Sequence, residues 1–355
     1  MPTLNARALL VVAACAAAAL LLVDIALQRT IPLDAKPREA QDGIRDLLVS
    51  DPETLVVGSS HSRTFHVLGV ELQKKIGSGG LPLVAIPLEN GKLIPYQWLL
   101  IHRVAPIIDR RARATATSPP KLRRMILLTE WWDSCDHPDG IYWNLPSRAW
   151  GLGDYLRDVA ANGITDYNRN FPRTVLRESA IHSPLVQDRT NPRIKEMLIA
   201  RAQGRRYPPP RTPEGEADRI QRWQRIVEKG VSCIGAADQM AAFDSILEFA
   251  GRRNLDMTVV LFPRKPATLS EQARQTTIAR FAKMIEEKTT ARGVRFLDLT
   301  TSTPLGDDDF MDDFDHVNAA GNLKFAAWAL DHDLRFLLER ASPPAGTAAR
   351  AETLE

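Results

Sequence analysis

The fold follows most directly from one segment, Thr54-Leu-Val-Val-Gly58-Ser-Ser-His-Ser-Arg63. A short apolar run leads into a turn of small residues, and residues 62–76 then have helical spacing. Continuous hydrophobicity is typical of a strand covered on both faces, as in a parallel sheet. The segment therefore predicts a buried strand, a tight turn and a helix.

The same alternation of strand and helix recurs along the chain. Further apolar runs lie at 81–86, 125–129 and 257–262, and 294–299 alternates in part. Stretches with helical spacing lie at 62–76, 94–111, 238–253, 270–291 and 318–339. The alternation predicts a doubly wound α/β domain of three layers with a parallel sheet of about five strands. It fails at about 135–235, which we interpret as a long insertion beside the active edge of the sheet.

The N-terminus is apolar enough to enter a membrane. Residues 8–27 carry a single charge, Asp24, and about 20 apolar residues cross a bilayer as a helix. We predict an uncleaved membrane anchor at 1–28, a linker at 29–50, the α/β domain at 51–341 and a disordered tail at 342–355. A cleaved signal peptide, or a lipoprotein signal at Val12-Ala-Ala-Cys15, is the alternative for the N-terminus.

Two signals compete over membrane orientation. Four cations follow the apolar segment, namely Arg29, Lys36, Arg38 and Arg45, and the positive-inside rule alone would keep the domain in the cytoplasm. Only seven residues precede the segment, which is typical of an anchor whose N-terminus stays inside. We expect a single-pass protein of the inner membrane with its domain on the periplasmic side.

Composition narrows the functional classes. The 355 residues include 46 Lys and Arg against 43 Asp and Glu, and these are spread along the chain, so a nucleic-acid partner is not expected. No repeat or long biased tract suggests a solenoid, a fibre or a disordered chain. Of the three cysteines, Cys15 lies in the apolar segment, and Cys135 and Cys233 form either a disulfide or two buried free thiols.

Two segments carry the residues of a nucleophilic site. A serine in the turn after the first strand lies at the carboxyl edge of the sheet, where open α/β folds bind ligands. Near the other end of the chain, His316 could accept the proton of a serine hydroxyl, and Asp313 could orient its imidazole. Each segment alone is also explained as a helix cap with a surface side chain. Both segments, however, are expected at the same edge of one sheet.

These residues resemble the SGNH, or GDSL-type, hydrolase superfamily over roughly 55–338. The resemblance rests on Gly58-Ser-Ser60 and on Asp313-Phe-Asp-His316. It implies a three-layer flavodoxin-like domain with Ser60 as nucleophile, His316 as base and Asp313 as the orienting carboxylate. No cofactor is implied.

The resemblance also implies an oxyanion hole, in which this chain departs from the family. The N–H groups of Ser60 and Gly91 are the expected donors. The family's third block supplies an asparagine, but here that strand runs into Glu130-Trp-Trp132. Either Asn90 substitutes, or Trp132 donates its indole N–H, or the site is weak, because a glutamate would repel an oxyanion.

The remaining candidates concern substrate and metal. Trp132, Glu130 and His61 are expected to contact substrate, although for His61 a place on the helix surface is the favoured explanation. Four tryptophans could stack on a sugar ring or pack the insertion: Trp131, Trp132, Trp143 and Trp150. A metal site is not expected, although one acidic set could be imagined as ligands: Glu130, Asp133, Asp136 and His137.

The Gly-Ser-Ser form behind an anchor looks closest to membrane-tethered branches of the family, which act in teichoic-acid D-alanine transfer and alginate O-acetylation. That resemblance implies a serine esterase or O-acyltransferase, most simply for acetyl groups, acting on a cell-envelope glycan. A membrane-bound O-acyltransferase is the implied partner. The alternative is a non-catalytic accessory protein of the same fold, docked on such a transferase.

Overall fold

The computed structural model describes 39–77, 80–88, 91–114, 121–135 and 213–339, with isolated positions at 11, 15, 18–19, 155–157, 159–160, 163–164 and 203. The chain divides into two units, one made of Met1–Lys36 and Gly153–Pro213, the other of Pro37–Leu152 and Glu214–Glu355. The second, here called the α/β unit, holds the sheet and the helices around it.

The α/β unit is built on a parallel five-stranded sheet of order β2-β1-β3-β4-β5. The strands are β1 (Thr54–Ser59), β2 (Leu83–Leu88), β3 (Arg124–Thr129), β4 (Asp256–Leu261) and β5 (Arg295–Asp298). This order is that of flavodoxin-like folds. The prediction of a parallel sheet of about five strands is confirmed, and β1 to β3 are buried throughout, as their continuous apolar runs indicate.

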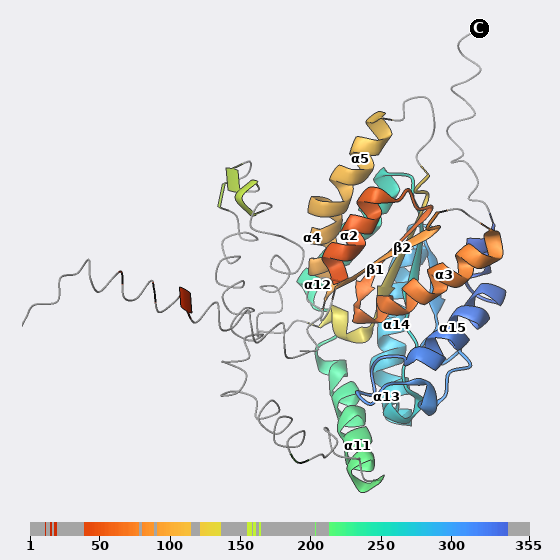
Figure 1. Ribbon diagram of the computed structural model, residues 1–355. Coiled ribbons are helices and arrows are strands. Elements are labelled where there is room, and N and C mark those ends of the chain that lie inside the picture. Colours follow the sequence, from red (N-terminus) through yellow and green to blue (C-terminus); the bar gives the residue numbers. More distant parts are fainter. Residues whose placement is uncertain are drawn as a thin grey trace, which may run out of the picture. The chain divides into compact units, whose positions relative to one another are not determined.

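Helices cover both faces of the sheet (Figure 1). The main helices are α2 (Glu39–Val49), α3 (Thr64–Ile76), α4 (Leu93–Leu99), α5 (Ala105–Ala114), α11 (Pro213–Lys229), α12 (Ala237–Arg252), α13 (Glu271–Ala273), α14 (Ala279–Thr290) and α15 (Ala319–Asp331). On one face α3 and α15 pack together, with the rings of Phe65 and Phe325 6.0 Å apart between centroids. On the other face lie α2, α4, α5 and α12, so the three predicted layers are present.

The predicted linker at 29–50 is wrong in its second half. Residues 39–49 form α2, which buries Ala40, Ile44 and Leu47. Their spacing places them on one helical face. Gly43 on the same helix approaches β2 so closely that an added Cβ would lie 2.5 Å from the carbonyl oxygen of Ala85. The α/β unit therefore begins before the first strand.

The insertion predicted at about 135–235 is interrupted by regular structure at its C-terminal end. Within it, α11 is a helix of 17 residues, and a disulfide joins Cys135 to Cys233 across a sequence separation of 98 residues. The disulfide decides between the two states expected for these cysteines. It ties the segment after β3 to the segment before α12, so both ends of the insertion are held at the same edge of the sheet.

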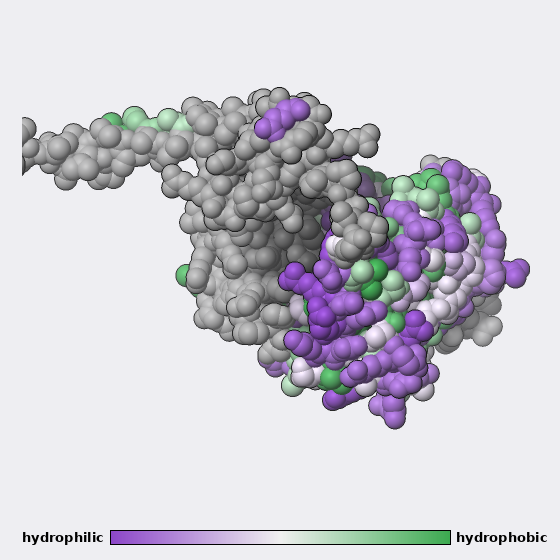
Figure 2. All heavy atoms as spheres, turned by 90° about the horizontal axis from the view of Figure 1, so that it is seen from below, coloured by the Kyte–Doolittle hydropathy of each residue, from purple (hydrophilic) through white to green (hydrophobic). Residues whose placement is uncertain are grey.

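The ends of the chain are largely outside the described residues. The anchor predicted at 1–28 is described only at 11, 15 and 18–19, and the tail predicted at 342–355 is not described. Within the described part of the chain, no helix combines the length and apolarity that crossing a bilayer needs. On the face in Figure 2, the coloured surface is mostly hydrophilic with scattered hydrophobic side chains, as is normal for a domain with a closed core.

Candidate active site

The first segment with predicted catalytic residues is the junction between β1 and α3. Gly58 lies in the buried strand, where an added Cβ would come within 2.7 Å of Leu128 on β3, so the neighbouring strand requires a residue without a side chain. After the strand, Ser60 begins a 3-10 turn that ends at Arg63. The hydroxyl of Ser59 accepts a hydrogen bond from the His61 N–H at 3.4 Å and caps this turn. Ser60 is thereby held at the carboxyl end of the central strands.

The second segment with predicted catalytic residues is the loop between β5 and α15. Phe310 and Val317 form an antiparallel bridge across it, and the Asn318 side chain caps α15 by accepting from the Gly321 N–H at 2.9 Å. Between the bridge residues, Phe314 has a φ of 65°, a conformation that costs about 1–3 kcal/mol for such a residue and persists only where the surroundings impose it.

Two cations hold the Phe314 ring. The Arg219 guanidinium of α11 and the Lys265 ammonium each lie 4.4 Å from the ring centroid. Arg219 also donates a hydrogen bond to the backbone carbonyl of Asp312. A helix of the predicted insertion thus supports the loop that carries Asp313 and His316.

Ser60, His316 and Asp313 meet as the sequence predicted. The Ser60 Oγ lies 2.6 Å from His316 Nε2, and His316 Nδ1 lies 2.8 Å from Asp313 Oδ2. An ionised carboxylate can only accept, so Nδ1 carries the proton and donates it to Asp313. Nε2 is then free of hydrogen and accepts from the Ser60 hydroxyl. This is the arrangement in which a histidine acts as general base toward a serine.

Asp313 is held in its ionised form. Burial alone would raise its pKa, but hydrogen bonds from the His316 ring and from the N–H groups of His316 and Asp315 outweigh it and lower the pKa to about 2. The carboxylate is therefore charged at any pH at which a neutral His316 could act as a base.

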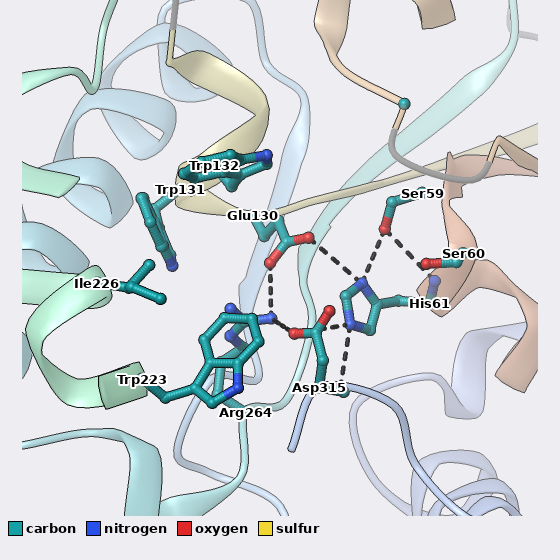
Figure 3. A pocket seen from close by; sticks show the side chains of 11 residues that line it. Ser59, Ser60, His61, Glu130, Trp131, Trp132, Trp223, Ile226, Arg264 and Asp315 are labelled. Carbon is teal, nitrogen blue, oxygen red and sulfur yellow. Dashed lines mark hydrogen bonds and ion pairs between the residues drawn. The ribbon is translucent and has the colours of Figure 1, made fainter. Parts of the chain in front are cut away.

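Four charged side chains form a second group beside the triad, here called the charge cluster, in which His61 and Arg264 are buried and Glu130 and Asp315 are half-buried (Figure 3). Arg264 lies 2.7 Å from Glu130 and in closer contact with Asp315. The His61 ring nitrogens lie 3.4 Å from Glu130 and from Asp315, and His61 Nδ1 is 2.8 Å from the hydroxyl of Ser59. With His61 protonated, the cluster holds two positive and two negative charges.

His61 is the titrating member of the cluster. Burial alone would lower its pKa, but the carboxylates of Asp315 and Glu130 outweigh burial and raise the pKa from 6.5 to about 10. Its ring also stacks on His316 with centroids 5.0 Å apart, and its Nε2 lies 3.1 Å from the carbonyl oxygen of Asp315. His61 therefore links the segment of Ser60 to the segment of His316.

The raised pKa of His61 predicts a pH dependence of stability. Above pH 6.5 the unfolded chain loses this proton while the folded chain keeps it up to about pH 10, so the free energy of unfolding should fall as pH rises across that window. The contribution is complete below pH 6.5. Urea unfolding at about pH 6, 8 and 10 should show this decline in the wild type and a flatter dependence in His61→Gln. Equal slopes in both proteins would contradict a protonated His61.

A pocket of about 260 Å³ opens beside Ser60. The residues that line it come from the segments after all five strands and from α11: Ser59, Ser60, His61, Gly91, Glu130, Trp131, Trp132, Trp223, Ile226, Arg264 and Asp315. Figure 3 shows the charge cluster between the serines on one side and Trp131, Trp223 and Ile226 on the other. The pocket thus joins a nucleophile to an aromatic wall.

The residues predicted to contact substrate, Trp132, Glu130 and His61, all line this pocket. His61 is 3% exposed, so its interpretation as a helix-surface residue is wrong. Glu130 does not stand as an uncompensated negative charge, since Arg264 and His61 bind it. Trp131 and Trp132 pack edge to face in the wall, while Trp143 and Trp150 lie outside the described residues.

The structure bears differently on each of the three predicted oxyanion donors. Gly91 lines the pocket, where Tyr96 and Leu88 leave no room for a Cβ. Its N–H, however, donates to the Leu88 carbonyl at 2.8 Å, so in this structure the prediction that this N–H serves an oxyanion is not met. Asn90 lies outside the described residues. That the Ser60 N–H serves an oxyanion stays a prediction.

Sequence reasoning missed three contributors to the site, namely Arg264, Asp315 and the helix α11. Arg264 follows the carboxyl end of β4, the edge where a charged residue indicates a ligand site. Asp315 lies inside the Asp-x-x-His segment itself. Trp223 and Ile226 are three residues apart on α11, which is the spacing of one helical face. The sequence positions of these residues were all visible, but no sequence pattern indicates which other residues they contact.

Two of the four candidate metal ligands, Glu130 and Asp133, are bound by protein groups. Asp133 accepts hydrogen bonds from the hydroxyls of Thr129 and Tyr96, and Asp136 and His137 lie outside the described residues. In the described part of the chain, His61, Asp315 and His316 offer ligand atoms within 4.8 Å of one another. A metal there would have to displace both the proton of His61 and the contact of His316 with Ser60.

Comparison with known proteins gives no family assignment. No protein-family model matches the chain, and no curated protein sequence matches it. Among solved structures, the chain is similar to a protein of Bacteroides fragilis provisionally assigned as an acylhydrolase, with 8% identity and a TM-score of 0.35 over 86% of this chain and all of the other.

Proposed function

We propose that this protein is a serine acyl-ester hydrolase or acyltransferase in which Ser60 is the nucleophile. The observation that carries the proposal is the continuous contact from Ser60 Oγ to His316 to Asp313, at 2.6 and 2.8 Å, beside a pocket. Removal of the hydroxyl proton by a positioned imidazole is what makes a serine nucleophilic at neutral pH.

In the proposed reaction Ser60 Oγ attacks the ester carbonyl as its proton moves to His316 Nε2. The carbonyl oxygen takes the negative charge next to the Ser60 N–H, and the ester bond breaks as His316 returns the proton to the leaving alcohol. Water or an acceptor hydroxyl then attacks the acyl-enzyme with His316 again as base. Glu130 would repel the oxyanion if its negative charge were uncompensated. Arg264 lies 2.7 Å from the Glu130 carboxylate and compensates this charge, and the charge cluster as a whole is neutral.

The finer proposal concerns substrate and location. The resemblance to membrane-tethered SGNH proteins supports an O-acyl group, most simply acetyl, on a cell-envelope glycan, with a membrane-bound O-acyltransferase as partner. The Cys135–Cys233 disulfide supports an oxidising compartment, since such bonds are rare in the cytosol. We therefore propose an inner-membrane protein whose α/β unit lies on the periplasmic side.

The test is covalent labelling of the full chain with a fluorophosphonate probe, which reacts with activated serines. We expect labelling of the wild type and of Ser302→Ala, an exposed serine that hydrogen-bonds only to the Asp298 carbonyl among the described contacts. Labelling should disappear in Ser60→Ala and in His316→Ala. A folded wild type that does not label would refute the proposal and favour the non-catalytic accessory protein.

A further inference from the structure

The contact between Ser60 and His316 joins two segments that are far apart in the chain. The two residues are 256 positions apart, and their side chains meet at 2.6 Å. Both belong to connections between a strand and a helix, and such connections are more mobile than the elements they join. A misplacement of about 1 Å between reacting groups can cost on the order of 100-fold in rate. A group that fixes one segment against the other would therefore matter for the proposed reaction.

His61 lies across this junction and contacts the residue that precedes each of the two. Its Nδ1 lies 2.8 Å from the hydroxyl of Ser59, the residue before Ser60. Its Nε2 lies 3.1 Å from the carbonyl oxygen of Asp315, the residue before His316. One side chain thus bridges the neighbour of the nucleophile and the neighbour of the base, with one hydrogen bond to each.

The His61 ring is also held by two other rings. It stacks on His316 with centroids 5.0 Å apart and planes at 20°. It contacts Phe262, which follows β4, with centroids again 5.0 Å apart. Phe262 in turn packs on Phe325 of α15 within the hydrophobic core. The ring that bridges the two segments is therefore itself fixed by the core.

The charge of His61 suits this bridging position. Burial alone would lower its pKa, but the carboxylates of Asp315 and Glu130 raise it to about 10, so at neutral pH both ring nitrogens carry a proton and donate. Together with Arg264, these two carboxylates make the charge cluster neutral. The cluster therefore places no net positive charge beside His316, which itself becomes positive when it acts as a base.

We propose that His61 is a positioning residue, which keeps Ser60 and His316 in contact by bridging the Ser59 hydroxyl and the Asp315 carbonyl. In this role it acts through His316 rather than on the ester itself. The inference rests on the proposed function. Loss of the bridge should lower kcat and leave KM nearly unchanged, because the substrate still binds while the serine and its base are misaligned.

The test measures kcat and KM of the full chain for 4-nitrophenyl acetate. His61→Phe keeps a ring beside His316 but has no N–H to donate, and we expect kcat to fall about 100-fold with KM within about threefold of the wild-type value. His332→Phe is the matched control. His332 also hydrogen-bonds to a carbonyl and stacks on a ring, both of Trp328, but it lies at the C-terminal end of α15. This control should keep the wild-type kcat.

Two further variants separate position from charge and from folding. In His61→Phe/Glu130→Gln the charges of Arg264 and Asp315 balance each other while the bridge is still missing, so the loss of kcat should persist. Ser59→Ala changes no charge and removes one end of the bridge. It should lower kcat about tenfold, the equivalent of one hydrogen bond, and it tests the bridge even where His61→Phe does not fold.

A wild-type kcat in His61→Phe, or recovery of kcat in the double variant, would overturn the inference. A raised KM with an unchanged kcat would also overturn it, because His61 would then be a substrate contact and not a positioning residue. Fluorophosphonate labelling separates these outcomes from failure of the proposed function. A folded wild type that does not label refutes that function and the inference with it, whereas a labelled wild type confines the failure to His61.

Discussion

A His316→Ala variant should turn over ester substrates roughly 10⁶-fold more slowly than the wild type, because the serine then has no base to take its proton. Asp313→Asn should lose roughly 10⁴-fold, since an amide that donates to the ring would favour the tautomer with its proton on Nε2. In that tautomer Nε2 no longer accepts from the Ser60 hydroxyl, which lies 2.6 Å away. Steady-state kcat with a chromogenic ester measures both losses.

A double variant tests whether Ser60 and His316 act together. If Ser60 and His316 act as one unit, the double variant Ser60→Ala/His316→Ala should be no slower than either single variant. His332→Ala is the matched control, because the His332 side chain is exposed and its described hydrogen bond and ring contact are both with Trp328. Additive losses in the double variant, or a His316→Ala enzyme within about tenfold of wild type, would count against the triad.

Arg264→Met should lower the free energy of unfolding by about 3–5 kcal/mol. The side chain of Arg264 is 6% exposed and bridges Glu130 and Asp315. Without it, two buried carboxylates share the single positive charge of His61. Chemical denaturation with a fluorescence readout measures the loss, and Arg252→Met is the matched control. Arg252 pairs with Glu248 at 3.7 Å on an exposed surface, so at most about 0.5 kcal/mol is expected there.

A compensating variant separates loss of charge balance from loss of packing. In Arg264→Met/Glu130→Leu the cluster retains one cation, His61, and one anion, Asp315, which lie 3.4 Å apart. Replacing a buried ion pair with apolar residues is often neutral, so the double variant should be more stable than Arg264→Met alone. A double variant as unstable as the sum of both single changes would show that charge balance is not the cause.

Local patterns were sufficient for most of the fold. The runs at 54–58, 125–129 and 257–262 correspond to β1, β3 and β4. Continuous hydrophobicity over only five or six residues is typical of a buried strand and is too short for most helices. The helix at 39–49 was missed, although its apolar residues repeat with helical spacing. It is short, and most of its stability comes from packing on β2 rather than from its own sequence.

The meeting of Ser60, His316 and Asp313 was predictable for a topological reason. Ser60 follows β1, and His316 and Asp313 lie between β5 and α15, so a parallel sheet brings both segments to its carboxyl edge whatever the details of packing. By contrast, only the tertiary structure pairs Glu130 with Arg264, 134 positions later in the chain, and places α11 against the loop through Arg219 and Phe314. Pairing, burial and the ring contacts of His61 depend on distances between side chains of separate elements. Sequence patterns report which face of an element a residue occupies, whereas these distances are set only when the elements pack together.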